Sequence, residues 1–167
     1  GLRVCCGGLF GLGETMAQRV ELALTLPIFL TLLLGVFEIA RLFFYNVSVA
    51  NASREAARYA ATSGCPSSTA CASSDLHYFQ DCSGIRNRAV VKSPGIGLKT
   101  TNVAISYDSG HGTSALYSDC SSSVSLASGN RVKITVTKPF SLIIPIPGLK
   151  SFSIVSTSYR TYLGQVQ

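Results

Sequence analysis

A long apolar run near the N-terminus constrains this chain more than any other feature. Sixteen residues from Leu22 to Phe37 contain no charged side chain. After one acidic and one basic residue, the apolar character resumes as far as Tyr45. The whole stretch has about the length that a helix needs to cross the hydrocarbon core of a bilayer, and we place the transmembrane part at about residues 22–45.

The two charges inside this stretch are Glu38 and Arg41. Because they are three residues apart, they meet on one face of a helix and can neutralise each other near the membrane interface. Pro27 removes one backbone hydrogen bond from the same helix, so we expect a kink or a local loosening there.

Two other structures could contain such a run, a buried core helix and a cleaved secretory signal. A buried helix of this hydrophobicity would need a much larger protein around it than 167 residues provide. The apolar region of a secretory signal usually has about 7–15 residues and ends at a small-residue cleavage site, which does not follow this run directly. Charged residues make up only 13% of the chain, roughly half of the usual globular share. We therefore expect a membrane anchor.

The helix is expected to continue beyond the membrane. The segment from Ala50 to Thr62 is rich in Ala, Arg and Glu, which are strong helix formers, and Gly64 and Pro66 then stop it. A stripe of small residues on this part would allow a sheet or a neighbouring helix to approach closely. Its expected members are Ala50, Ala57, Ala60 and Ala61.

Three parts of the chain follow from these signals. Residues 1–16 are Gly-rich and lack helical periodicity, which is typical of a leader or a disordered segment. Cys5 and Cys6 lie in this part, and two interpretations stay open for them, lipidation or simply a place in a leader. One long helix is expected at 17–63 and a head at 64–167.

The head is expected to be α+β. Three of its segments alternate apolar and polar residues and predict strands of a small antiparallel sheet, at residues 102–108, 131–137 and 151–164. A short second helix is expected over Leu76–Ser93, with an interruption at Gly84. Three prolines in the segment 139–148 indicate an extended loop or an edge segment. Because such a sheet has one apolar face, it needs a cover, which the Ala-rich helix can supply.

Four of the six cysteines lie in the head. In a small head rich in Ser, Thr and Gly they predict two disulfides and an oxidising compartment. A zinc site would need closely paired spacing such as Cys-x-x-Cys, and Cys65 and Cys71 are too far apart for it. Of the three possible connectivities we prefer Cys65–Cys71 with Cys82–Cys120.

No sequence pattern predicts catalysis, a metal or a cofactor, so we expect that the protein is not an enzyme. It has two histidines, His77 and His111, and none of the HExxH, GxSxG or Walker patterns. Residues 108–112 combine Asp, Ser and His, but adjacency in the sequence is not the geometry of a catalytic triad, and the Asp, Ser and Gly of this segment are the residue types that a turn requires. The formal net charge is +6, yet the 14 Lys and Arg are scattered, so no nucleic acid is expected as a partner.

The long helix resembles the signature of TadE-like proteins, the minor pilin or pseudopilin components of tight-adherence (Flp, type IVc) pili. In that family a Glu stands at the mouth of an apolar helix, a Pro follows, then Gly, an acidic residue and Arg, and an Asn-Ala-x-Arg-Glu-x-Ala-Arg-Tyr-Ala segment completes the pattern. The matching residues here are Glu21, Pro27, Gly35, Glu38, Arg41, Asn51, Ala52, Arg54, Glu55, Ala57, Arg58, Tyr59 and Ala60. The segment VKITVTKPFSLIIPIPG and the strand after it are also similar, so the likeness runs from Gln18 to about Tyr162.

The resemblance implies a pilin-like fold with a single pass through the bacterial inner membrane and a periplasmic or extracellular head, in the membrane or incorporated into a pilus. It implies other pilin and pilus-assembly subunits, membrane lipid and a prepilin peptidase as partners. The implied assembly residues are Glu21, Pro27, Glu38 and Arg41. In assembly, Glu21 would attract a neighbour's N-terminal amine and set the axial register. The alternative for Glu21 is an interfacial residue that faces lipid head groups.

The processing of the N-terminus and the function class each allow two interpretations. Pilin-class leaders are cut after a Gly with the Glu fifth in the mature chain, which here makes Ala17 the first residue and puts Met16 at the Gly position. With Met16 at this position, the leader could remain uncleaved or be cut at an irregular site. A second function class also fits, a stand-alone membrane-tethered module whose head binds a ligand or partner outside the cytoplasm.

The cysteine quartet predicts the topology. Residues before about Gln18 should lie in the cytoplasm and those after about Tyr45 outside it, because disulfides form in oxidising compartments. Single-Cys variants in intact spheroplasts, treated with a membrane-impermeant thiol reagent, should react at a reporter in the head and not at position 5. Labelling at position 5 without labelling of the head would contradict this topology.

Overall fold

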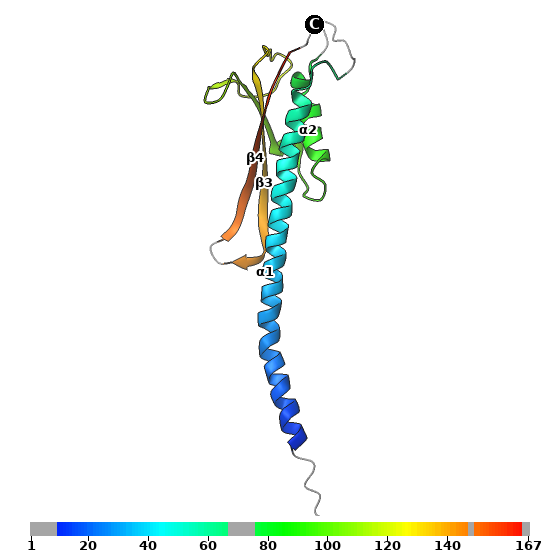
Figure 1. Ribbon diagram of the computed structural model, residues 1–167, viewed down its shortest axis with the longest axis vertical. Helices are drawn as coiled ribbons and strands as arrows, with labels where there is room; N and C mark the ends of the chain where they lie inside the picture. Colours follow the sequence, from blue (N-terminus) through cyan, green and yellow to red (C-terminus); the bar gives the residue numbers. More distant parts are fainter. Residues whose placement is uncertain (1–9, 67–75, 147–148, 165–167) are drawn as a thin grey trace, which may run out of the picture. The chain divides into compact units, whose positions relative to one another are not determined.

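The structure, a computed structural model, describes residues 10–66, 76–146 and 149–164 of the chain. Within this part it contains one long helix, a short second helix and a four-stranded antiparallel sheet, so the expected α+β fold is confirmed (Figure 1). The chain forms two compact units, Gly1–Arg41 and Leu42–Gln167. The elements in chain order are α1 (Phe10–Ala60), the 3-10 helix η1 (Tyr78–Gln80), α2 (Cys82–Val91), the 3-10 helix η2 (Thr100–Asn102), β1 (Val103–Asp108), β2 (Ala115–Tyr117), β3 (Arg131–Ile146) and β4 (Leu149–Thr161).

α1 begins earlier than the sequence predicts. The expected start is Ala17, but the helix also includes residues 10–16, which the sequence places in a leader. No proline interrupts that segment, and each residue added to an existing helix costs little because it also adds a hydrogen bond. Pro27 lies inside the helix without ending it. The helix stops at Ala60, and Gly64 follows with a φ of 106°, a left-handed conformation that only Gly adopts readily.

The sheet has the strand order β2-β1-β3-β4, and each neighbouring pair of strands is antiparallel. The three strands that alternation predicts correspond to β1, β3 and β4. Alternation does not predict β2, because its three residues are too few to establish a period. On β3 the alternating apolar residues Val132, Ile134 and Val136 are fully buried.

β3 continues through the proline-rich segment. β1 pairs only with residues 131–136 of β3, whereas β4 pairs with β3 continuously from Arg131 to Ser141. Beyond Val136 one side of β3 therefore has no strand next to it among the described residues. A strand with one free side tolerates a residue without an amide hydrogen, which accommodates Pro139. Over residues 139–146 the edge interpretation is confirmed and the loop interpretation is wrong.

Within the unit Leu42–Gln167, α1 contributes one stripe of mostly small residues to the core. The residues of the stripe are all 0% exposed: Val49, Ala52, Ser53, Ala56, Ala57 and Ala60. The expected stripe needs a correction, because Ala50 and Ala61 are only partly buried while Ala52 and Ala56 belong to the core. The Ala residues of this segment surround the helix, so only the position of the sheet decides which of them are covered.

The buried stripe includes one polar side chain. The Ser53 hydroxyl lies 3.0 Å from the hydroxyl of Ser156 and 2.9 Å from that of Ser158, both on β4. It also donates to the carbonyl of Ala50 at 3.0 Å. The hydroxyl is therefore satisfied in the core, as a buried polar group must be.

The second helix is shorter than the expected Leu76–Ser93. η1 comes first and α2 begins at Cys82, so Gly84 lies in the first turn of α2 instead of interrupting a longer helix. Asp81 caps α2, because its Oδ1 accepts a hydrogen bond from the Gly84 amide at 2.9 Å. A Cβ atom on Gly84 would lie 1.9 Å from Oδ2 of Asp81, so the cap requires glycine here.

Cys82 and Cys120 form a disulfide, as the preferred pairing expects. It joins the first residue of α2 to the segment that follows β2. Cys65 is disulfide-bonded as well. Its expected partner, Cys71, lies outside the described residues.

Removal of the Cys82–Cys120 bridge should destabilise the head. The two residues are 38 positions apart, so the double variant Cys82→Ser/Cys120→Ser should lose about 3–4 kcal/mol of unfolding free energy in denaturant titrations. Ser123→Ala is the matched control in the same segment, since it removes only an exposed hydroxyl contact to Ser121 and should change little. Equal stability of the double variant and the control would contradict the expectation, as would free thiols at both positions in protein from its native compartment.

Candidate functional site

The apolar side chains of α1 between Val20 and Ile39 are exposed on all sides of the helix. Every large apolar side chain from Val20 to Ile39 is between 48% and 67% exposed. Such a surface is far larger than the apolar patches that a protein leaves in water. At about 25 cal/mol for each Å² of apolar surface, its transfer out of water is strongly favourable. This segment therefore needs a lipid or protein environment around it.

A shallow groove of about 440 Å³ runs along this segment. Its lining is almost entirely apolar and consists of Ile28, Thr31, Leu32, Gly35, Val36 and Ile39. At its centre Gly35 has no side chain, and a Cβ placed there would meet no atom within 4 Å. The Thr31 hydroxyl donates to the Pro27 carbonyl at 2.8 Å, so the only polar side chain of the groove is satisfied within the helix.

The structure brings two of the four expected assembly residues together. Arg41 Nη1 and Glu38 Oε2 are 2.9 Å apart, and their side chains are 24% and 10% exposed. The spacing in the sequence predicts this local pair. Glu21 is exposed and lies seventeen residues before Glu38, which is about 25 Å along a helix. Neither Glu21 nor Pro27 is therefore part of the ion pair. The expected leader cysteines, Cys5 and Cys6, lie outside the described residues.

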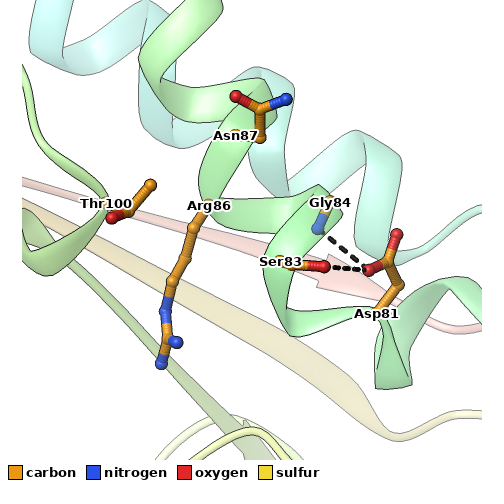
Figure 2. Close-up of a pocket in the computed structure, with 6 residues that line it drawn as sticks. All are labelled: Asp81, Ser83, Gly84, Arg86, Asn87 and Thr100. Atoms are coloured by element: carbon orange, nitrogen blue, oxygen red, sulfur yellow. Dashed lines mark hydrogen bonds between the residues drawn. The ribbon is translucent and has the colours of Figure 1, made fainter.

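The head contains a polar pocket of about 510 Å³ beside the first turn of α2 (Figure 2). Asp81, Ser83, Gly84, Arg86, Asn87 and Thr100 line it. The carboxylate of Asp81 is already engaged, since Ser83 and the Gly84 amide donate to its Oδ1 at 2.9 Å. Arg86 extends away from Asp81 in Figure 2 and reaches Asp119 at 3.5 Å. The charged groups of this pocket do not converge on one point.

The Asp81 carboxylate also joins α1 to α2. Its Oδ2 accepts a hydrogen bond of 2.8 Å from the hydroxyl of Tyr59, near the end of α1. Burial, followed by this hydrogen bond, raises the pKa of Tyr59 to about 12. Burial pushes the pKa of Asp81 upward, but the hydrogen bonds from Gly84, Tyr59 and Ser83 together outweigh it, so that pKa lies below its ordinary value. The sequence pattern did not indicate this contact, because it placed Asp81 inside the second helix instead of at its cap.

The segment that combines Asp, Ser and His is a structural turn. Oδ1 of Asp108 accepts hydrogen bonds from Arg131 Nε at 2.6 Å and from the Gly110 amide at 3.2 Å. Arg131 also donates to the Gly110 carbonyl at 2.6 Å. His111 follows in the exposed loop. Within the described ranges no group of three or more His, Cys, Asp or Glu is placed to hold a metal ion.

Among the residues that the structure describes, these features define one helix that is long and apolar enough to cross a membrane, over Gln18–Ala60, and an α+β head. Residues 18–58 match the family model described as "TadE-like protein". The matched segment lies within α1 and contains all four expected assembly residues, so the resemblance noted in the sequence is confirmed for this helix. The match ends before the head begins.

A short stretch of the chain is similar to a different kind of protein. It is 81% identical over 26 residues to "Biotin synthase" of Geobacter metallireducens, with 16% of this chain and 8% of that protein covered. Biotin synthases of Geobacter sulfurreducens and Citrifermentans bemidjiense are 81% and 77% identical with the same shares covered. The chain thus spans 8% of the length of these relatives, and so short a stretch transfers no activity. No solved structure matches the chain.

The Tyr59–Asp81 contact should make stability depend on acid pH. The pKa of Asp81 in the folded state is lowered, so its ionised carboxylate stabilises the fold. This stabilisation is fully present above the ordinary pKa of 3.8 and is lost as the pH falls through the pKa of the folded state. Tyr59→Phe removes one of the bonds that lower this pKa, so the variant should lose less unfolding free energy between neutral and acid pH. At neutral pH it should be less stable by about 1–2 kcal/mol.

Tyr117→Phe is the matched control for this variant. Tyr117 is 37% exposed, and the substitution keeps the contact between its ring and the ring of Tyr107. Its acid dependence should equal that of the wild type. Denaturant unfolding followed by circular dichroism at several pH values measures all three proteins. An unchanged acid dependence in Tyr59→Phe would contradict the role of this bond.

Proposed function

We propose that this chain is a membrane-anchored minor pilin or pseudopilin subunit that acts in the assembly or structure of a tight-adherence (type IVc) pilus. The observation that carries the proposal is the coincidence of two findings on one helix. Residues 18–58 match the TadE-like family, and the same helix exposes all its large apolar side chains from Val20 to Ile39. A helix of this kind fits a lipid bilayer or a bundle of like helices.

The proposed place of the protein is the bacterial inner membrane, with one pass and the head on the periplasmic or extracellular side. The Cys82–Cys120 disulfide supports this orientation, because disulfides persist outside the reducing cytoplasm. Its proposed partners are other pilin and pilus-assembly subunits, membrane lipid and a prepilin peptidase. In this proposal the chain has no catalytic role.

Two acidic residues of the helix would act differently in the membrane. Glu38 has Arg41 at 2.9 Å, so its charge is compensated within the chain and is compatible with a place near the interface. Glu21 is exposed and lies at the start of the apolar run, where an unpaired carboxylate at the edge of hydrocarbon is costly. The amine of a neighbouring subunit would relieve that cost. We therefore assign Glu21 to the pairing of subunits and the Glu38–Arg41 pair to the stability of the anchor.

A stand-alone binding module remains the second function class, and the head gives it less support. The polar pocket beside α2 is the place where a ligand would bind, but its carboxylate already accepts three hydrogen bonds from the chain itself. Stable co-isolation with other pilus components supports the pilus subunit. A small molecule retained in the head pocket supports the binding module.

Glu21→Gln tests the pairing role, because it removes the charge and keeps nearly the same shape. Loss of one member of a pair in a medium of low dielectric constant costs about 3–5 kcal/mol, so piliation should fall strongly. The membrane level of the protein should stay near normal, since a neutral residue inserts more readily than a charged one. Both quantities are measured together in the native host.

Glu55→Gln is the matched control on the same helix. Glu55 pairs with Arg58 at 3.6 Å on the surface, and such pairs contribute about 0–1 kcal/mol. Piliation should therefore stay normal in this variant. Normal piliation in Glu21→Gln would remove the pairing role and leave Glu21 as an interfacial residue.

A further inference from the structure

We propose that the free edge of β4 binds an extended, acidic segment of another protein by adding it to the sheet as a further strand. β4 is an outer strand of the sheet, with β3 on one side and, among the described residues, no strand on the other (Figure 1). Unpaired main-chain groups along such an edge are a template for another strand. This inference concerns the head alone and goes beyond the pilus function proposed above.

The register shows which residues offer their main chain to a partner. The Tyr162 amide donates to the Asn130 carbonyl at 2.8 Å, one step beyond the pair Thr161–Arg131. In an antiparallel pair the direction of the amides alternates along the strand, so even-numbered residues of β4 direct theirs to β3. Odd-numbered residues direct theirs to the free edge. Between residues 151 and 159 these are Ser151, Ser153, Val155, Thr157 and Tyr159.

Other free strand edges of this sheet carry protective features that the stretch from residue 151 to 159 of β4 lacks. β2 has only three residues. The free side of β3 beyond Val136 contains Pro139 and Lys138, and the Lys138 ammonium donates to the Gly97 carbonyl at 2.8 Å. Proline, lysine and short length are the usual means by which proteins prevent strand addition. β4 has thirteen residues and no proline, and residues 151–159 carry no charge.

The outward side chains of β4 fit a partner strand of mixed character. Val155 is 57% exposed and Tyr159 is 45% exposed, and hydroxyl residues alternate with them. The Thr157 hydroxyl lies 3.2 Å from that of Thr135 on β3, which shows how such residues pair across strands on this face. A partner strand with Val and Thr at alternating positions would extend the same pattern.

The charges near the end of β4 select the partner. Arg131 and Lys133 lie 4.9 and 5.8 Å from the ring of Tyr159, and Arg160 follows it. Asp108 pairs with Arg131, whereas within the described part of the chain neither Lys133 nor Arg160 has an acidic partner. An acidic end on the added strand would meet these cations. β4 of a second copy contains no Asp or Glu, so it lacks this complement and a different protein is the better partner.

The test uses the full chain in detergent micelles and a short synthetic peptide of alternating Val and Thr with two Glu at its N-terminal end. In antiparallel addition that end lies beside Arg160. Amide hydrogen exchange, measured by NMR, should slow at Val155, Thr157 and Tyr159 when the peptide is added. The amides of Ile154 and Ser156, which already bond to β3, should be slow before and after. The same peptide with Lys in place of Glu should bind more weakly, and salt should reduce the difference.

Val155→Pro removes one amide that points to the free edge, and its ring lies beside the added strand. Because one main-chain hydrogen bond to the peptide is lost, binding should weaken by about tenfold. Exchange at Ile154 and Ser156 should show that the sheet is intact. Val155→Thr keeps the amide and should bind normally.

Four results overturn the proposal. Without peptide, the edge amides could already exchange slowly in the monomer, or their exchange could slow as the protein concentration rises. With peptide, their exchange could stay unchanged, or Val155→Pro could bind the peptide as tightly as the wild type does.

Discussion

The packing of the head depends on the small residues along one side of α1. Ala52, Ala56, Ala57 and Ala60 are fully buried and leave room for the helix backbone to lie close to its neighbours in the core. Alanine also loses no side-chain entropy when it is buried. A larger side chain at any of these positions would separate the packed elements, and overpacking of this kind costs about 1–3 kcal/mol. The large side chains of the core, such as Tyr107 and Phe140, come from the strands instead.

The same helix uses two opposite arrangements of its apolar residues. From Val20 to Ile39 large side chains surround it and all are exposed, while from Val49 to Ala60 the buried residues follow one stripe. A helix that is apolar on all sides requires an apolar medium or other helices, whereas a helix with one apolar stripe covers the core of a domain in water. α1 is therefore suited to two environments, and the division of the chain between Arg41 and Leu42 falls between them.

Much of this arrangement can be predicted from the sequence because its signals are local. The apolar run predicts the helix, alternation predicts β1, β3 and β4, and the spacing of Glu38 and Arg41 predicts their ion pair. The buried stripe could not be predicted in detail, since alanines lie on several sides of the helix and only the sheet selects among them. The hydrogen bond from Tyr59 to Asp81 depends on tertiary structure in the same way. A partner for Glu21 would lie on another chain, so no single-chain pattern could define it.

The contacts that fix the head are concentrated at the start of α2. Within four consecutive residues, Asp81 accepts a hydrogen bond from Tyr59 of α1, Cys82 is bonded to Cys120, and Gly84 donates to the cap. Local opening is least favourable where several independent constraints meet, because each must be broken. β4, by contrast, is held by its ladder with β3, by ring and hydroxyl contacts to residues of β3, and by the hydroxyl contacts to Ser53. A partner that adds a strand to β4 would therefore not have to displace any described hydrogen bond of the head.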